Sequence, residues 1–212
     1  MAARRGAEGS RDPEDKGEDG RMKVISITGG VGSGKSEVLK ILEQEFGARI
    51  LVADQIAHQL MEPETEGYRQ VVKALGDSFL GADGQIDRKK LADLIFRDPE
   101  AVKTMNGIIH PMVWQEIQDA IREESRELVV VEAALFDEEH NAMFDEIWYV
   151  YTSRENRIRR LMASRGYTEK KCRDIMANQA SEEEYRKLAD RVLDNNGPVE
   201  EIRSQLSRFL TQ

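Results

Sequence analysis

One eight-residue stretch, GGVGSGKS at residues 29–36, constrains the fold of this chain more than any other feature. It fits the pattern G-x-x-x-x-G-K-[ST] and lies between an apolar run at 23–28 and a helical pattern at 36–46. A strand, a glycine-rich loop and a helix in this order form a phosphate-binding loop, because the glycines let successive backbone N–H groups point at phosphate oxygens. The helix N-terminus adds the positive end of its dipole. The stretch therefore predicts a P-loop domain that binds ATP or GTP.

Four further short apolar runs, at 48–53, 128–131, 146–151 and 191–194, alternate with helical sequence. Strands that alternate with helices predict a parallel sheet with right-handed crossovers. We expect an α/β, P-loop NTPase-like fold with a five-stranded parallel sheet flanked by helices. Its core would consist of residues 22–62 and 128–212.

The segment 63–127 shows helical patterns only, at 67–75, 88–96, 100–108 and 112–124. It stands between the second and third predicted strands. Ligands of open α/β sheets bind at the carboxyl ends of the strands. We therefore expect a helical insertion beside the ligand edge of the sheet.

The composition limits the partners of the chain. It has 212 residues and a formal net charge of −9, which argues against broad nucleic-acid binding because phosphate backbones attract positive surfaces. No apolar run approaches the roughly 18 residues of a membrane span, and the start of the sequence has no apolar signal-peptide region. We expect a cytoplasmic protein without nucleic-acid or membrane partners. Residues 1–21, rich in glycine and charge, predict a disordered tail. The sequence does not specify an oligomeric state, and a monomer is the expectation.

Three polar residues are candidates for holding the phosphates and a metal ion. Lys35 can reach the β- and γ-phosphates, and the Ser36 hydroxyl can ligate Mg²⁺. Glu132 follows the third predicted strand, where P-loop folds often hold a carboxylate near the metal or its water shell; such an acid can equally be a solvated turn residue. The later strands are not followed by N-K-x-D, so the sequence disfavours a switch GTPase.

The densest cluster of arginines in the chain lies at 154–181, after the fourth predicted strand. Phosphoryl transfer spreads negative charge over the γ-phosphate oxygens, and a helical lid that carries arginines can neutralise this charge and exclude water. We interpret the segment as such a lid. The alternative is a solvated helix whose arginines pair with neighbouring acids.

Several short motifs together resemble the dephospho-coenzyme A kinase family over residues 22–210. The matching pieces are TGGVGSGKS at 28–36, AD at 53–54 followed by IAH, GQIDRKKLADLIF at 84–96, IIHPMV at 108–113, RLMASRG at 160–166, ANQAS at 177–181 and DNNG at 194–197. Each piece alone is weak, whereas their common order and spacing are specific. The resemblance implies a P-loop core, an inserted acceptor (coenzyme A) domain at 63–127 and a lid at about 154–181. It also implies that the γ-phosphate of ATP is transferred, with Mg²⁺, to the 3′-hydroxyl of dephospho-coenzyme A in the last step of coenzyme A biosynthesis.

The resemblance assigns residues to both substrates. The residues implied to hold ATP are Gly29, Gly30, Val31, Gly32, Ser33, Gly34, Lys35, Ser36 and Glu37, with Asn195 and Gly197 beside the adenine. The residues implied on the acceptor side are Asp54, Arg88, His110 and Pro111, with Gln179 in the lid. Catalytic roles would fall to Lys35, Asp54 and Arg160. From the residues alone, His110 before a proline is more often a capping or packing residue at a helix start, and DNNG equally fits a tight turn with a helix cap.

The chain departs from the family at the end of the second strand, where the family commonly reads D-A-D and this chain reads Val52-Ala53-Asp54. Val52 cannot accept a proton. If the strand continues to Asp54, residues two apart point to the same face, so Asp54 would lie one pleat nearer the open end. We therefore hypothesise that Asp54 alone takes the role of the base. His58, one helical turn later, can approach the acceptor phosphates, although a histidine on a helix face is more often structural.

Two other functions remain open from the sequence. The first is another P-loop small-molecule kinase, with a nucleoside, nucleotide or shikimate-like acceptor in the insertion. The second is a nucleotide-binding regulatory module that lost catalysis when Val52 replaced the acid. Lys35, Ser36 and the arginine-rich lid argue against the second alternative, because a module that only binds does not need a lid.

Overall fold

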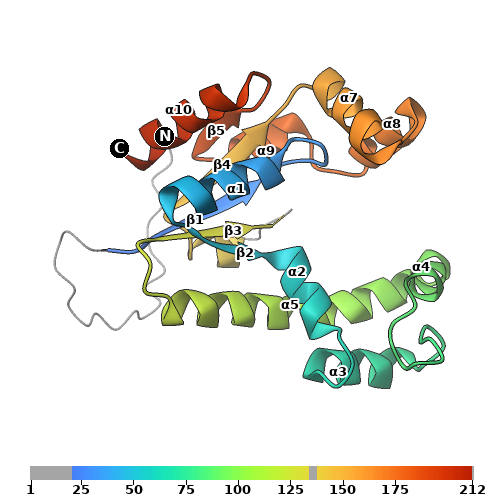
Figure 1. Cartoon of the computed structure of the whole chain (residues 1–212). Coiled ribbons are helices and arrows are strands. Elements are labelled where there is room, and N and C mark those ends of the chain that lie inside the picture. The colour runs from blue at the N-terminus through green and yellow to red at the C-terminus, as the bar shows by residue number, and fades with distance from the viewer. Residues whose placement is uncertain (1–20, 134–137, 212) are drawn as a thin grey trace.

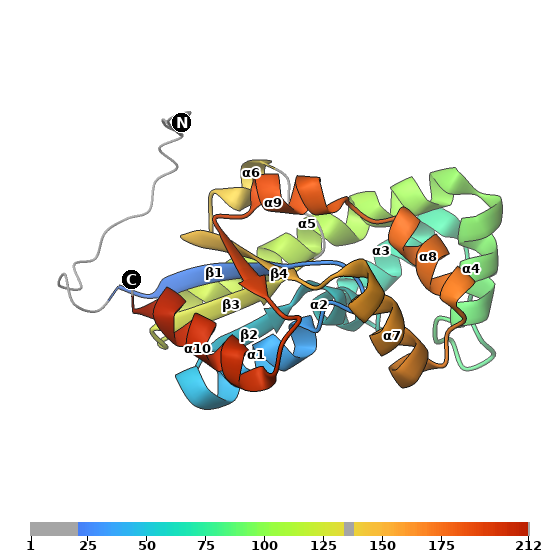
Figure 2. The ribbon, with the colours of Figure 1, turned by 90° about the horizontal axis from the view of Figure 1, so that it is seen from above.

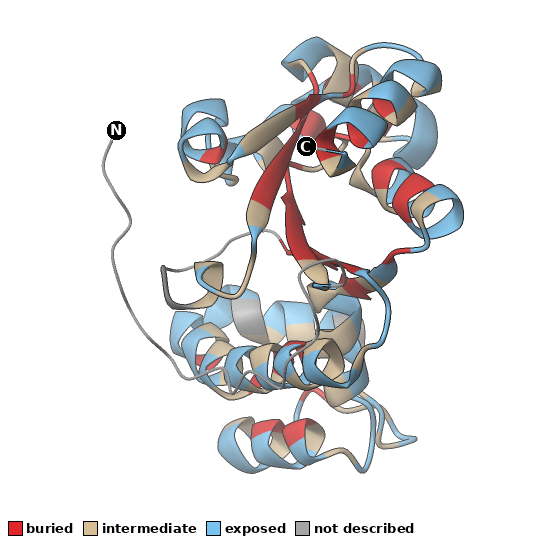
Figure 3. Cartoon of the chain, turned by 90° about the vertical axis from the view of Figure 1, so that its left-hand side faces the viewer, coloured by how far each residue is buried: buried red, intermediate tan, exposed pale blue. Residues whose placement is uncertain are grey.

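The computed structural model describes residues 21–133 and 138–211. Its centre is a five-stranded sheet in which every neighbouring pair of strands is parallel, with the order β2-β3-β1-β4-β5. The strands are β1 (Lys23–Thr28), β2 (Arg49–Val52), β3 (Leu128–Glu132), β4 (Glu146–Tyr151) and β5 (Arg191–Asp194). The predicted α/β fold and its parallel sheet are confirmed. Figure 3 shows that the buried residues concentrate on these strands.

Helices α1 (Lys35–Phe46) and α10 (Val199–Leu210) cover one face of the sheet (Figure 1). The side chains of Ile25 and Ile27 in β1 point to this face and join Leu42 of α1 and Leu206 of α10 in one buried cluster. Successive residues of a strand point to opposite faces, so Val24 belongs to the other cluster. This packing fixes the start of α1 at the carboxyl end of β1.

Helix α5 (Pro99–Glu123), from the segment between β2 and β3, lies along the opposite face of the sheet (Figure 1). Helices α2 (Ala53–Leu60), α3 (Glu66–Leu75) and α4 (Arg88–Arg97) of the same segment pack against α5. Ile109, Val113 and Ile117 of α5 pack against Val129 and Val131 of β3. The helical segment therefore shares a core with the sheet through α5.

The expected break between helices at 100–108 and 112–124 is wrong, because α5 continues through Pro111. A proline inside a helix removes one backbone hydrogen bond and crowds the carbonyl four residues earlier. Here the apolar stripe of Ile109, Val113 and Ile117 is buried on both sides of the proline. Their spacing of four residues favours one continuous helix against the sheet, and Pro111 itself lies on the exposed side.

Helices α7 (Arg154–Arg165) and α8 (Glu169–Ala177) lie near the N-terminus of α1 (Figure 2). Ile158, Leu161 and Cys172 form their small core, against which Val31 of the P-loop packs. Ser153 caps α7 through a hydrogen bond from the backbone N–H of Asn156. The predicted lid segment is therefore two short helices in contact with the P-loop.

The remaining helices are α6 (Glu138–Asn141) and α9 (Glu182–Leu188). Helix α9 begins with a capping box between Ser181 and Glu184, and Tyr185 on α9 stacks on Tyr149 of β4 with ring centroids 4.9 Å apart. The predicted disordered tail, apart from Arg21, lies outside the described residues. Within residues 21–133 and 138–211, none of the helices combines the length and the apolarity that a bilayer crossing requires.

Candidate active site

The P-loop leaves the carboxyl end of β1 and ends at Gly34, the N-cap of α1. Gly34 has φ 89° and ψ 21°, a left-handed conformation that favours glycine. Among the described residues no side chain caps this helix. The first N–H groups of α1 and its positive dipole end are therefore open to an anion.

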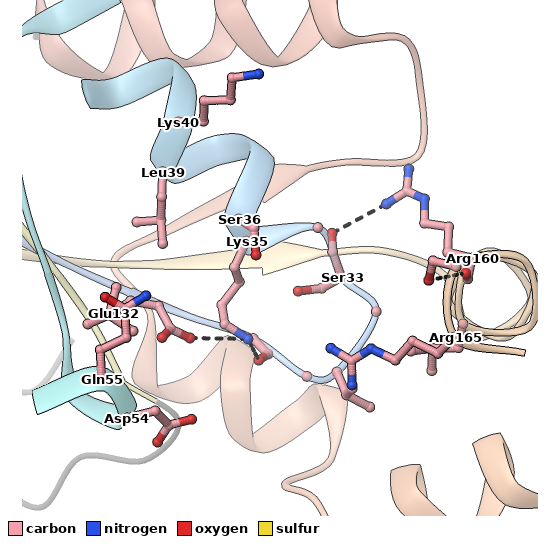
Figure 4. A pocket seen from close by; sticks show the side chains of 18 of the residues that line it. Ser33, Lys35, Ser36, Leu39, Lys40, Asp54, Gln55, Glu132, Arg160 and Arg165 are labelled. Atoms are coloured by element: carbon pink, nitrogen blue, oxygen red, sulfur yellow. Dashed lines mark hydrogen bonds and ion pairs between the residues drawn. The ribbon is translucent and has the colours of Figure 1, made fainter. Parts of the chain in front are cut away.

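A cavity of about 820 Å³ lies in front of this helix end (Figure 4). A volume of this order is typical of small-molecule and cofactor sites. Its walls include the whole P-loop together with residues from α2, β3, α7 and the segment after α8. The lining residues among the candidates are Gly29, Gly30, Val31, Gly32, Ser33, Gly34, Lys35, Ser36, Asp54, Glu132, Arg160 and Gln179. Most of the predicted site is thus brought together in one cavity.

Lys35 points from α1 towards Glu132 at the end of β3 (Figure 4). Its Nζ donates a hydrogen bond of 2.6 Å to the carbonyl oxygen of Gly29 and lies 3.4 Å from Glu132 Oε1. Both side chains are largely buried, with 18% and 14% of their surface exposed. Burial raises the pKa of Glu132 above its usual value; the charge of Lys35 opposes this effect and that of Asp54 adds to it. The charge of Lys35 therefore offsets only part of the cost of burying the ionised Glu132 carboxylate.

The raised pKa of Glu132 predicts that Glu132→Gln stabilises the fold at neutral pH. A carboxyl group with a raised pKa in the folded state contributes its full stability below its ordinary value of 4.5 and loses it as the pH rises through the raised value. At pH 8 the variant should therefore melt at a higher temperature than the wild type. This difference should shrink towards pH 4.5.

Thermal unfolding followed by circular dichroism at several pH values measures this difference. The exposed Glu116→Gln serves as the matched control and should leave the melting temperature unchanged across the same series. A Glu132→Gln protein that melts lower than the wild type at pH 8, or a difference independent of pH, would contradict the prediction.

Ser33 is the most enclosed polar residue of the loop. Its carbonyl oxygen accepts hydrogen bonds from Asn195 Nδ2 at 2.7 Å and Thr152 Oγ1 at 2.9 Å. Its own Oγ is buried and has no hydrogen-bond partner among the described residues. Buried polar atoms usually have a partner, so this hydroxyl fits a bound anion that supplies one.

Asp54 lies in the cavity wall, but on a different element from the expected one. Strand β2 ends at Val52, and Asp54 belongs to the first turn of α2. The expectation that Asp54 extends the strand is therefore wrong, because the chain turns into a helix one residue after Val52. Val52 instead lies directly opposite Glu132 in the pairing of β2 with β3. Asp54 and Glu132 consequently meet at the cavity from neighbouring elements.

Arg160 of α7 and Gln179 after α8 contact the P-loop directly. Arg160 donates from Nη2 to the carbonyl oxygen of Asn195 at 2.8 Å, and its Nη1 lies 3.4 Å from that of Ser33. Gln179 Oε1 accepts from the backbone N–H of Val31 at 3.0 Å. Asn195 is buried behind the loop and, like Gly197 and Glu37, does not line the cavity.

Three acceptor-side candidates, His58, His110 and Pro111, do not line this cavity. His58 faces its own helix, with Nδ1 2.6 Å from the carbonyl oxygen of Asp54. His110 and Pro111 are exposed on α5. Arg88 begins α4, and its side chain lies outside the described residues.

Sequence reasoning missed three residues as individual members of the site. Thr152 directly follows β4, and its hydroxyl donates to the carbonyl oxygen of Ser33. Arg157 donates from Nε to the carbonyl oxygen of Val31 at 2.8 Å, and Arg165 lines the cavity. The two arginines were part of the recognised cluster, but helical spacing could not tell which of its members face the loop. Thr152 carried no signal beyond its place after a strand.

The residues present fit a magnesium ion that is bound together with a nucleotide. Mg²⁺ usually takes one or two protein oxygens and fills its other positions with phosphate oxygens and water. The Ser36 hydroxyl and the Glu132 carboxylate offer such oxygens in the same cavity. No group of three or more His, Cys, Asp or Glu side chains within the described ranges could hold a metal without the nucleotide.

Comparison with known proteins finds similarity to a family model, to curated proteins and to solved structures. A family model described as "Dephospho-CoA kinase" matches residues 23–201. A "Dephospho-CoA kinase" of Carboxydothermus hydrogenoformans is 38% identical over 193 residues, which cover 89% of this chain and 93% of the relative. The crystal structure of TT1252 from Thermus thermophilus matches with a TM-score of 0.75 and 31% identity, over 90% of this chain and 97% of that one.

A "Dephospho-CoA kinase" from Campylobacter jejuni shares the fold, with a TM-score of 0.64 at 21% identity, over 89% of this chain and 95% of that one. The match of the family model extends from the first residue of β1 into α10 and so includes the P-loop, the helical segment and helices α7 and α8. On this coverage, the chain belongs to the dephospho-CoA kinase family.

Proposed function

We propose that this protein transfers the γ-phosphate of ATP to the 3′-hydroxyl of dephospho-coenzyme A, giving coenzyme A and ADP. The observation that carries the proposal is the meeting of an uncapped helix N-terminus, Lys35 and two carboxylates in one cavity. Membership of the family supplies the acceptor. We further propose that the protein acts in the cytoplasm as a monomer, without nucleic-acid or membrane partners.

The P-loop forms the donor half of the site. Backbone N–H groups from Gly29 to Ser36 hold the phosphates, and the buried Ser33 hydroxyl contributes a further hydrogen bond. Lys35 moves its Nζ from Glu132 to the β- and γ-phosphate oxygens, which carry more negative charge than the single carboxylate. The adenine would lie towards Asn195 and Gly197, and Glu37 in the first turn of α1 would complete the donor half.

Ser36 and Glu132 would hold Mg²⁺, directly or through its water shell. The ion neutralises charge on the β- and γ-phosphates when it is bound. Glu132 is suited to this position, since a cation compensates the partly buried carboxylate once Lys35 has moved to the nucleotide. The positive charge of the ion would then lower the pKa of Glu132 from its raised value.

Asp54 serves the acceptor. Its carboxylate orients the 3′-hydroxyl and takes its proton as the oxygen attacks the γ-phosphorus, while the bond from that phosphorus to the β-phosphate oxygen breaks and ADP leaves. A loose transition state asks little of the base, so positioning and charge neutralisation provide most of the acceleration. Arg160 and Lys35 supply that positive charge from the two sides of the loop.

The helical segment 63–127 would bind the rest of the acceptor as a separate functional domain. Arg88 at the start of α4 and the exposed His110-Pro111 on α5 are the residues proposed for this contact. His58 would approach the acceptor phosphates from α2. The lid at about 154–181, with Gln179, would close over both substrates and exclude water.

An acceptor panel tests the proposed reaction. ADP release is measured with dephospho-coenzyme A, adenosine, adenosine monophosphate, shikimate and no acceptor, each with Mg·ATP. We expect turnover with dephospho-coenzyme A alone. Turnover with another acceptor would select a different small-molecule kinase, and nucleotide binding without turnover would select a regulatory module.

A further inference from the structure

Arg157 occupies a position between the P-loop and the lid that differs from those of its neighbouring arginines. From α7 its Nε donates to the carbonyl oxygen of Val31 at 2.8 Å, and its Nη2 donates to Gln179 Oε1 at 2.8 Å. Gln179 Oε1 in turn accepts from the backbone N–H of Val31 at 3.0 Å. The three residues therefore close a ring of hydrogen bonds that includes both backbone polar groups of Val31.

The guanidinium also packs against the backbone at Gly30. A Cβ atom added to Gly30 would overlap Arg157, and its three nearest atoms all belong to that guanidinium. The φ of Gly30 is not in the left-handed region, so the backbone there does not itself require glycine. Contact with Arg157 is the feature of the structure that explains a residue without a side chain at this position.

The charge of Arg157 has no carboxylate partner among the described residues. Tyr149 and Tyr185, whose stacked rings have centroids 4.9 Å apart, lie close enough to act on it electrostatically. Partial burial lowers the pKa of Arg157 from its ordinary value, and an arginine remains charged even so. A positive charge is thus held against the backbone of Gly30 and Val31, the two residues that we call the crest of the phosphate-binding loop.

The geometry points to Arg157 as a positioning residue that fixes Gly30 and Val31 at the crest of the P-loop and joins this crest to the lid through Gln179. Because the loop is already ordered before ATP binds, less of the binding free energy is lost in ordering it. Removing the ring of hydrogen bonds should therefore weaken nucleotide binding more than it slows the chemical step.

The shape of the guanidinium distinguishes this role from a simple charge effect. Arginine presents donors in a rigid planar fork, which can serve the Val31 carbonyl and the Gln179 amide at once. A lysine at 157 would keep the charge but would offer a single ammonium group at one point. Arg157→Lys should therefore behave like Arg157→Ala and should not behave like the wild type.

The experiment measures the dissociation constant of a fluorescent ATP analogue with Mg²⁺ and without acceptor, followed by kcat and KM for ATP with dephospho-coenzyme A. We expect Arg157→Ala and Arg157→Lys each to raise the dissociation constant at least about tenfold, with a smaller change in kcat. The exposed Arg159, whose Nη2 donates to Asn156 Oδ1 on its own helix, provides the matched control, and Arg159→Ala should bind like the wild type.

Gly30→Ala gives an independent test that keeps Arg157 in place. The added methyl group should displace the guanidinium and raise the dissociation constant as Arg157→Ala does. In the Arg157→Ala background the methyl group has room, so the double variant should bind no more weakly than Arg157→Ala alone. If Arg157→Ala does not fold, as judged by thermal unfolding, Arg157→Lys and Gly30→Ala against the wild type decide the question.

Three results would overturn the inference: wild-type binding by Arg157→Ala, full rescue by Arg157→Lys, or additive losses in the double variant. The inference rests on the proposed kinase only in its kinetic measurements, because nucleotide binding is measured without acceptor. If the variants bind ATP weakly but the wild type has no turnover, the proposed function is contradicted and this inference stands. If the variants bind ATP normally and the wild type has turnover, this inference is contradicted and the proposed function stands.

Discussion

Replacing Lys35 by methionine should lower kcat with dephospho-coenzyme A by about a hundredfold to a thousandfold, the range seen when one preorganised donor to a developing negative charge is removed. Lys35 is the cation of α1 that reaches both Gly29 and Glu132 in the resting cavity. Methionine keeps the length and apolar stem of the side chain and removes its charge. Initial rates of ADP release at saturating acceptor measure the effect.

Lys187→Met on the exposed side of α9 is the matched control and should retain wild-type turnover. The Lys35→Met protein should still unfold cooperatively. The substitution removes the ion pair with Glu132, but Lys35 is not part of the hydrophobic core. A Lys35→Met protein with more than about a tenth of wild-type turnover would show that other groups carry the phosphate charge.

Asp54→Asn should lower kcat by about a hundredfold while the dissociation constant for ATP stays within about twofold of the wild-type value. The substitution keeps the shape of the side chain and removes its capacity to accept a proton. Asp54 lines the cavity on α2, across from the P-loop, so the loss should appear in the acceptor step. Steady-state kinetics with both substrates varied, together with ATP binding, separates the two effects.

The matched control is Asp119→Asn, which alters an exposed acid paired with Arg122 on α5. It should leave both kinetic constants unchanged. An Asp54→Asn enzyme with an unaffected rate would remove Asp54 from the mechanism and leave Glu43 and Glu132 as the other carboxylates that line the cavity within the described part of the chain.

The P-loop was predictable from sequence because its chemistry is local. Glycine spacing, the Lys-Ser pair and the flanking strand and helix all lie within about twenty consecutive residues, and each has one structural consequence. The parallel sheet followed from the alternation of apolar runs and helical patterns in the same way. These features need no knowledge of distant contacts.

Long-range contacts decided what the sequence could not. Pro111 is a strong local signal for a helix boundary, yet the burial of Ile109 and Val113 against the sheet keeps α5 continuous through it. Asp54 was expected on a strand, and the turn into α2 moved it to a helix. Arg157 could not be singled out, because the residues that identify it, Val31 and Gln179, lie 126 and 22 positions away.

The position of the transferred phosphate tests the central claim most directly. Dephospho-coenzyme A is incubated with Mg·ATP and the enzyme, and the product is examined by phosphorus NMR with coupling to the ribose protons. We predict one new phosphomonoester signal coupled to the proton on the 3′ carbon, with one ADP formed for each product. A phosphate on the 2′ carbon or on another part of the acceptor, or ADP formed without a phosphorylated acceptor, would contradict the account.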